Sequence, residues 1–134
     1  MNPINTALCS YGMSGLVFHG PLLEVHPGYK VSKILERTRN ESKGKHPGSL
    51  LVRDFQAIID DPEIERGVVN TPDHLHVDMA SRAMEAGKHV VVEKPFTLLT
   101  SEADQLIELA EKQNVILSVY HNRRWDGVYL TVKE

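Results

Sequence analysis

Strand-like and helix-like segments alternate along this chain. Six apolar stretches are short enough to be buried strands, namely residues 4–10, 29–36, 49–52, 67–70, 89–92 and 115–120. The segments between them carry helix signals: a short helix before Pro21, a helical turn within 37–48, a helix over 55–59 with Asp54 as N-cap, a helix from Thr71 that stops at Gly87, and a helix capped by Thr100 or Ser101. Alternating strands and helices form βαβ units with right-handed crossovers. The pattern therefore predicts an α/β fold with a doubly wound parallel sheet, in the strand order 3-2-1-4-5-6.

The composition excludes several classes of protein. The 134 residues suffice for one domain with a real core, and 25% of them are charged, as in ordinary globular proteins. A net charge of −3 gives no basic surface for nucleic acid, and no apolar run reaches the ~20 residues that span a bilayer. No secretory signal is visible, and the single cysteine, Cys9, excludes an internal disulfide. We expect a cytoplasmic protein with no nucleic-acid or membrane partner.

The first strand-like stretch leads into a glycine-rich turn, Ser10-Tyr11-Gly12-Met13-Ser14-Gly15. It matches the dinucleotide-binding pattern G-x-G-x-x-G, except that Ser10 stands at the first glycine. Gly12 would let the backbone approach a pyrophosphate, and Gly15 would let the following helix pack closely on the strand. The amides at the helix start, around Met13 and Ser14, would attract the phosphates. Two glycines after a strand also occur in ordinary turns, which is the alternative.

Charged residues at the end of the second strand bear on the choice of dinucleotide. Glu36 lies about 20 residues beyond the turn, the usual separation of the acid that binds the adenosine ribose. Arg37 and Arg39 follow it. An arginine beside the ribose binds a 2′-phosphate, which Glu36 would repel. The residues favour NAD and leave NADP open, and a solvated acid at a strand end is the alternative for Glu36.

The fourth strand-like stretch ends in Asn70-Thr71-Pro72-Asp73, where the strand order reverses. Pro72 suits the first turn of a helix, and Thr71 can cap that helix or reach the ribose side of a dinucleotide. His76 is either a site residue or an ordinary helix histidine. His74 and His76 diverge on a helix because they are two residues apart, so we expect no metal site.

The fifth strand-like stretch ends in Val92-Glu93-Lys94-Pro95. Open α/β sheets bind ligands at the carboxyl ends of their strands, so Lys94 is a candidate for proton transfer. A position beside an oxidised, positively charged nicotinamide would make its ammonium group a better proton donor. Pro95 restricts Lys94 to an extended backbone, and we expect a cis Lys94–Pro95 bond that sets the direction of the amine. A lysine that points into water is the alternative.

A polar cluster, Asn122-Arg123-Arg124-Trp125, follows the last strand-like stretch. The planar guanidinium groups of arginine suit pairs of oxygen atoms. The cluster is therefore a candidate binding site for an anionic or polyol substrate. A surface loop with Trp125 packed against a neighbour is the alternative.

Four motifs together resemble the family of glucose-fructose oxidoreductases, inositol dehydrogenases and rhizopine catabolism proteins (Gfo/Idh/MocA). They are residues 12–21, 70–76, 86–95 and 118–126. The run Ala-Gly-Lys-His-Val…Glu-Lys-Pro in the third motif is the most specific. The resemblance implies a Rossmann domain over residues 1–121 that binds NAD or NADP. Ser10 departs from the usual first glycine.

The resemblance also assigns roles to residues. It implies that Lys94 is the catalytic lysine and that Glu93 and Pro95 border the nicotinamide. It implies that Thr71, Pro72 and His76 line the cofactor cleft. Family members continue into a second, substrate-binding domain, so residues 122–134 would begin the connection to a domain that this chain lacks.

The function implied is that of an NAD(P)-dependent oxidoreductase, which transfers a hydride between nicotinamide and a CH–OH group of a sugar, an inositol or a related polyol. The chain alone should bind dinucleotide with little or no turnover, because half of the substrate pocket is absent. The surface that would face the second domain should be apolar, so we expect association into a homo-oligomer. The alternatives are a non-catalytic dinucleotide-sensing regulatory module and an NAD-dependent glycosidase.

Overall fold

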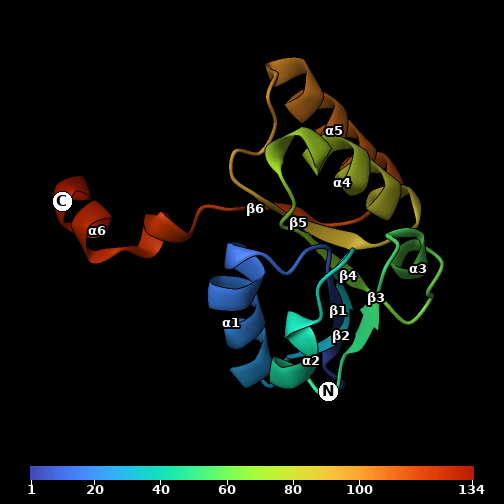
Figure 1. Ribbon diagram of the computed structural model, residues 1–134. Helices are drawn as coiled ribbons and strands as arrows, with labels where there is room; N and C mark the ends of the chain where they lie inside the picture. Colours follow the sequence, from blue (N-terminus) through green and yellow to red (C-terminus); the bar gives the residue numbers. More distant parts are fainter.

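The computed structural model describes residues 1–134 and contains one sheet of six parallel strands (Figure 1). The strands are β1 (Ile4–Leu8), β2 (Tyr29–Leu35), β3 (Leu50–Val52), β4 (Arg66–Val69), β5 (His89–Glu93) and β6 (Leu117–Tyr120). Their order is β3-β2-β1-β4-β5-β6, which confirms the predicted doubly wound topology. The order reverses between β1 and β4, and a ligand crevice is typical of that point.

Helices cover both faces of the sheet (Figure 1). The helical segments are the π-helix η1 (Ser14–His19), α1 (Gly20–Val25), α2 (Glu41–Lys45), α3 (Gln56–Ile59), the 3₁₀ segment η2 (Asp73–Leu75), α4 (His76–Glu85), α5 (Thr100–Gln113), the 3₁₀ segment η3 (Asn122–Trp125) and α6 (Gly127–Lys133). α4 and α5 pack together on one face, whereas α1 and η1 lie on the other. The connections of the two halves of the sheet thus run over opposite faces.

Successive side chains of the central strands build two separate cores. Ala7 of β1 and Cys9, which follows the strand, belong to the core that includes α4 and α5, whereas Leu8 belongs to the core beneath α1. Val69 and Val68 of β4 divide in the same way. Burial raises the pKa of the Cys9 thiol to about 12, so this cysteine is a packing residue. Because helices cover both faces of the sheet, the central strands are apolar on both sides and do not alternate between apolar and polar residues.

Several helix boundaries differ from the sequence prediction, and others agree with it. The first helical region does not stop before Pro21, because η1 continues into α1 and Pro21 lies in the first turn of α1. A proline in that position lacks only an amide that the helix does not use. Gly87 follows the end of α4 with a φ of 78°, as the pattern predicts. Asp54 is not the N-cap of α3, because the helix begins at Gln56 and Phe55 is its N-cap residue, but Asp54 accepts a hydrogen bond from the amide of Gln56 at 2.9 Å.

The prediction for the start of α5 is wrong. Neither Thr100 nor Ser101 caps this helix. The carboxylate of Glu102 instead accepts hydrogen bonds from the amides of Leu98 and Leu99, at 3.2 and 3.1 Å. Glu102, the third residue of the helix, thus bonds back to amides that precede it, as the Glu of a capping box does.

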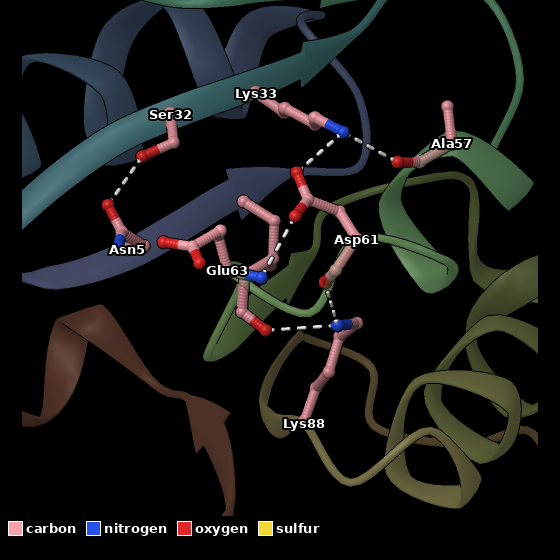
Figure 2. A network of polar contacts seen from close by, with 8 residues as sticks. Asn5, Ser32, Lys33, Ala57, Asp61, Glu63 and Lys88 are labelled. Carbon is pink, nitrogen blue, oxygen red and sulfur yellow. Dashed lines mark hydrogen bonds and ion pairs between the residues drawn. The ribbon is translucent and has the colours of Figure 1, made fainter.

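A polar network ties β2 and the start of β5 to the connection between α3 and β4 (Figure 2). The ammonium group of Lys88, a residue 3% exposed, donates to the carbonyl oxygens of Asp61 and Ile64 at 2.7 and 2.9 Å. Lys33 lies 2.7 Å from the Asp61 carboxylate and keeps the pKa of that group below its usual value. Lys88, in the most specific of the four motifs, therefore holds a connection in place.

The last residues lead away from the sheet. η3 and α6 follow β6 and extend to one side of the molecule (Figure 1). Asp126 accepts a hydrogen bond from the amide of Val128 at 2.9 Å and so caps α6. None of the helices combines the length and the apolar character that crossing a membrane requires.

Candidate functional site

A cleft of about 560 Å³ opens at the carboxyl ends of β1, β2 and β4. Its walls are formed by residues that follow these strands, including Gly12, Glu36, Arg37, Thr71 and Pro72. The structure thus brings together five of the residues that the sequence predicted to bind a cofactor. They come from three separate parts of the chain and meet at the crevice expected for this topology.

The glycine turn after β1 is tightly packed despite the serine at its first position. A Cβ atom on Gly15 would lie 2.8 Å from the carbonyl oxygen of Ser10, so a larger residue does not fit there. The nearest atom to a Cβ on Gly12 would be 4.0 Å away, and the backbone of Gly12 lies open on the cleft. Asn70 donates a hydrogen bond to the Ser10 carbonyl at 2.9 Å and ties the turn to the end of β4. This cradle fits a phosphate-binding turn.

Met13 and Ser14 lie beside the cleft rather than on its walls. Met13 is 78% exposed, and Ser14 is the first residue of η1. Both residues directly follow Gly12, which lines the cleft, so their backbone lies next to the cleft.

Two residues that line the cleft have hydroxyl groups without a hydrogen-bond partner. They are the phenol of Tyr11 and the hydroxyl of Thr71, and both oxygen atoms are buried. The expectation that Thr71 caps the next helix is wrong, because η2 begins after Pro72 without a side-chain cap. Buried polar atoms are normally satisfied, so this part of the cleft suits a ligand rich in hydroxyl and phosphate oxygens.

Glu36 lies at the cleft wall, but its carboxylate faces the start of α2. One oxygen accepts a hydrogen bond from the amide of Glu41 at 3.1 Å. The other accepts hydrogen bonds from the amide and the hydroxyl of Ser42, at 3.0 and 2.5 Å. Glu36 and Ser42 are 6% and 2% exposed. The carboxylate predicted to bind ribose hydroxyls thus has three donors within the protein.

Basic residues form the cleft wall next to Glu36. Arg37 makes no ion pair, whereas Arg39 pairs with Glu41 at 3.2 Å. Arg53 also lines the cleft and donates to the carbonyl oxygens of Glu36 and Arg39, at 2.9 and 2.5 Å. In the sequence, the only signal for Arg53 is its position directly after the third strand.

His76 lies beneath the cleft rather than on its wall. The residue is fully buried, and its two ring nitrogens face the carbonyl oxygens of Pro95 and Thr71, each at 2.8 Å. His76 therefore joins the segment after β4 to the segment after β5. It can position both segments without contacting a bound molecule.

Glu93, the last residue of β5, pairs with His19 of η1 at 2.8 Å. The ring of His19 also lies 4.3 Å from the ring of Tyr120, and the residue is 5% exposed. Burial lowers the pKa of His19, and the hydrogen bond to Glu93 opposes that shift without cancelling it. His19 lies in the first of the four motifs, but nothing in the sequence indicates its contact with Glu93.

Lys94 lines a second hollow, of about 1080 Å³, with Pro95 and residues 122–124. Lys94 is exposed, and its ammonium group makes no hydrogen bond or ion pair with the rest of the chain. The Lys94–Pro95 peptide bond is cis, as predicted. Trp125 lies outside this hollow and is 76% exposed. The predicted catalytic residue thus meets three of the four predicted substrate-binding residues.

The two hollows lie at the carboxyl ends of neighbouring parts of one sheet. β4 and β5 pair directly, and His76 links the segments that follow them. The first hollow offers a glycine turn and guanidinium groups, which suit phosphates. The second offers an amine beside further guanidinium groups. An extended ligand in the first hollow could therefore have its far end near Lys94.

Several known proteins are similar to this chain in sequence and in fold. Residues 4–121 match a model of the GFO_IDH_MocA family, described as an oxidoreductase family with an NAD-binding Rossmann fold. The whole chain is 43% identical to the scyllo-inositol 2-dehydrogenase (NADP(+)) IolW of Bacillus subtilis and covers 37% of it. Over 79% of its length, the chain is 31% identical to the myo-inositol 2-dehydrogenase of Thermotoga maritima and covers 32% of that protein.

A solved structure of an oxidoreductase has the same fold as this chain. The chain superposes on a crystal structure of a Bacteroides fragilis protein assigned as an oxidoreductase, with a TM-score of 0.94 and 50% sequence identity. The superposition covers 98% of this chain and 39% of that structure. The chain thus spans well under half the length of the relatives that it matches.

Proposed function

The chain belongs to the Gfo/Idh/MocA oxidoreductase family, and on this premise we propose that it is the dinucleotide-binding part of an NAD(P)-dependent oxidoreductase. The observation that carries the proposal is the cleft in which Gly12, Arg37 and Thr71 meet. The turn at Gly12 would hold the pyrophosphate, and the loop at Arg37 would hold the adenosine ribose. The unpartnered hydroxyl of Thr71 would serve as a further polar contact.

Of the two dinucleotides, NADP suits this cleft better. The carboxylate of Glu36 is bonded to α2, so it is poorly placed to accept the ribose hydroxyls of NAD. Arg37 has no acidic partner, and a guanidinium group binds phosphate through paired hydrogen bonds. The NADP dependence of the relative IolW agrees with this choice. We therefore propose NADP as the dinucleotide, in place of the NAD that the sequence position of Glu36 favours.

The chemistry centres on Lys94. When bound, the nicotinamide supplies hydride transfer, as in other enzymes that use this cofactor. Lys94 would exchange a proton with the reacting substrate oxygen, for which its unpaired ammonium group is free. Asn122, Arg123 and Arg124, which share the hollow with Lys94, would hold the hydroxyl groups of a sugar, an inositol or a related polyol. We expect the chain alone to bind dinucleotide without turnover.

Calorimetric titration of the 134-residue chain with NADP and with NAD tests the binding proposal. We expect NADP to bind more tightly than NAD. Arg37→Ala should weaken NADP binding roughly tenfold, because a charge-assisted contact with the phosphate is lost, and should change NAD binding little. Lys112→Ala, on α5 away from the cleft, is the matched control. Failure of the unchanged chain to bind either dinucleotide would reject the proposed function.

A chimera tests the role of Lys94. In it, this chain replaces the matching part of IolW, and oxidation of scyllo-inositol by NADP is measured. Removing a group that transfers a proton typically slows a reaction roughly 100- to 10,000-fold, so we expect a loss of kcat of that size for Lys94→Met. Affinity for NADP should persist, and Lys112→Met should leave the rate unchanged. Full turnover by the Lys94→Met chimera would show that the lysine is not catalytic.

A further inference from the structure

The acid at the end of β2 is held by the protein itself. Its carboxylate receives three hydrogen bonds, one from the amide of Glu41 and two from Ser42. The contact from the Ser42 hydroxyl is the shortest of the three, at 2.5 Å. Because an ionised carboxylate offers about four acceptor positions, little capacity remains for a ligand.

The loop beyond this acid is fixed in the same arrangement. The guanidinium group of Arg53 donates to the carbonyl oxygens of Glu36 and Arg39 and to the side chain of Asn40. Residues 37–39 are consequently held at the cleft wall while the Glu36 side chain is turned toward α2. Arg37 is left without an acidic partner at the place where an adenosine ribose is expected.

We infer that Ser42 is a specificity-determining residue. By holding the Glu36 carboxylate against α2, it lets the cleft accept a dinucleotide whose adenosine ribose carries a 2′-phosphate. The inference rests on the proposed function, since it concerns the same cleft. Ser42 acts through Glu36 and makes no contact with the dinucleotide.

The electrostatics explain the effect. A carboxylate that faced the ribose would repel a 2′-phosphate and would bind the free hydroxyls of NAD. Here the hydrogen bonds to α2 turn the Glu36 carboxylate away from the ligand. The cleft then presents guanidinium groups to the phosphate, and NAD loses its main acceptor. Cofactor choice thus depends on a serine six residues beyond the acid.

Calorimetry of the full 134-residue chain, with NADP and NAD as the probes, tests this inference. Ser42→Ala removes the hydroxyl donor, the shortest of the three contacts, and leaves the Glu36 carboxylate held only by the backbone amides of residues 41 and 42. We expect the ratio of the NAD and NADP dissociation constants to fall about tenfold, the effect of one hydrogen bond to a charged group. Adding Glu36→Gln to Ser42→Ala should restore the preference for NADP, and the double-mutant cycle measures this coupling.

The control is Ser49→Ala, which removes another serine hydroxyl with a 2.5 Å hydrogen bond, in this case to the Val31 carbonyl. It should leave the ratio unchanged. If Ser42→Ala does not fold, the single variant Glu36→Gln tests the inference. A ratio of the NAD and NADP dissociation constants within about threefold of the original supports a carboxylate held away from the ribose. A shift of about tenfold toward NADP overturns the inference.

The results separate the two proposals. Binding of neither dinucleotide by the unchanged chain rejects the proposed function. Tighter binding of NAD by the unchanged chain rejects the preference for NADP and with it the inference about Ser42, while dinucleotide binding stands. A preference for NADP that Ser42→Ala does not alter rejects only the inference about Ser42.

Discussion

The two ring nitrogens of His76 both lie 2.8 Å from carbonyl oxygens, those of Pro95 and Thr71. A neutral imidazole has one N–H group and donates to one of these carbonyls, whereas the imidazolium form donates to both. Leucine at this position would donate to neither. Because a polar group that loses its partner costs about 1–3 kcal/mol, we expect His76→Leu to lower the free energy of unfolding by roughly 2–3 kcal/mol in urea titrations.

His74 provides the matched control for this residue. Its side chain is exposed, and its nearest acidic neighbour, Asp73, is 3.9 Å away. Exposed substitutions of this kind change stability by about 0.5 kcal/mol or less, so His74→Leu should unfold at nearly the urea concentration of the unchanged chain. Equal stability of the His76→Leu and His74→Leu variants would mean that the two carbonyl contacts contribute nothing.

Between elements, the pair of His19 and Glu93 joins η1 to the end of β5. Burial lowers the pKa of His19 below 6.5 in the folded chain. The unfolded chain therefore binds a proton at a pH where the folded chain does not, and the free energy of unfolding falls as the pH drops through 6.5 toward the folded pKa. The binding of one proton changes the free energy of unfolding by at most about 1.4 kcal/mol per pH unit.

Urea unfolding of the unchanged chain and of His19→Gln between pH 7.5 and 5, a range chosen from the unfolded pKa of about 6.5, measures this dependence. Glutamine can still donate to Glu93 but does not titrate. We expect the variant to lose less stability than the unchanged chain as the pH falls. His74→Gln removes an exposed histidine and serves as the control. Parallel pH profiles for His19→Gln and the unchanged chain would contradict the role of buried His19.

The elements themselves were largely predictable from the sequence. Apolar stretches separated by helix signals specify a parallel sheet, and the ends of its strands placed Gly12, Arg37, Thr71 and Lys94 at one edge. Contacts made by individual side chains were not predictable. The His19–Glu93 pair joins residues 74 positions apart, and only the packing of η1 on the sheet reveals it.

The sequence also did not predict which hydrogen-bond donors the Glu36 carboxylate would bind. Spacing places Glu36 at the site but says nothing of the direction of its carboxylate, which depends on where α2 begins. In the same way, a serine at the first position of the glycine turn weakens the sequence pattern. The structure shows that Asn70, from another strand end, secures that turn.

For the whole molecule, the end of the chain presents an apolar surface. Val128 and Val132 are 76% and 81% exposed, and they lie one turn apart on α6, which extends away from the sheet (Figure 1). Trp125 adds a further large side chain, also 76% exposed. Association removes exposed apolar side chains from water. We therefore expect the chain to form oligomers as its concentration rises.

Analytical ultracentrifugation over a range of concentrations measures this association. Val128→Asp combined with Val132→Asp should shift the chain toward the monomer, because a charge at each position opposes burial. Val25→Asp is the matched control: Val25 is 79% exposed but lies on α1, so the same charge there should leave association unchanged.

Val128 and Val132 also line the hollow that contains Lys94. Association through α6 would therefore cover the hollow assigned to the substrate while leaving the cleft at Gly12 open, and dinucleotide affinity should be the same in monomer and oligomer. A single monomeric species at every concentration would rule out this role for α6.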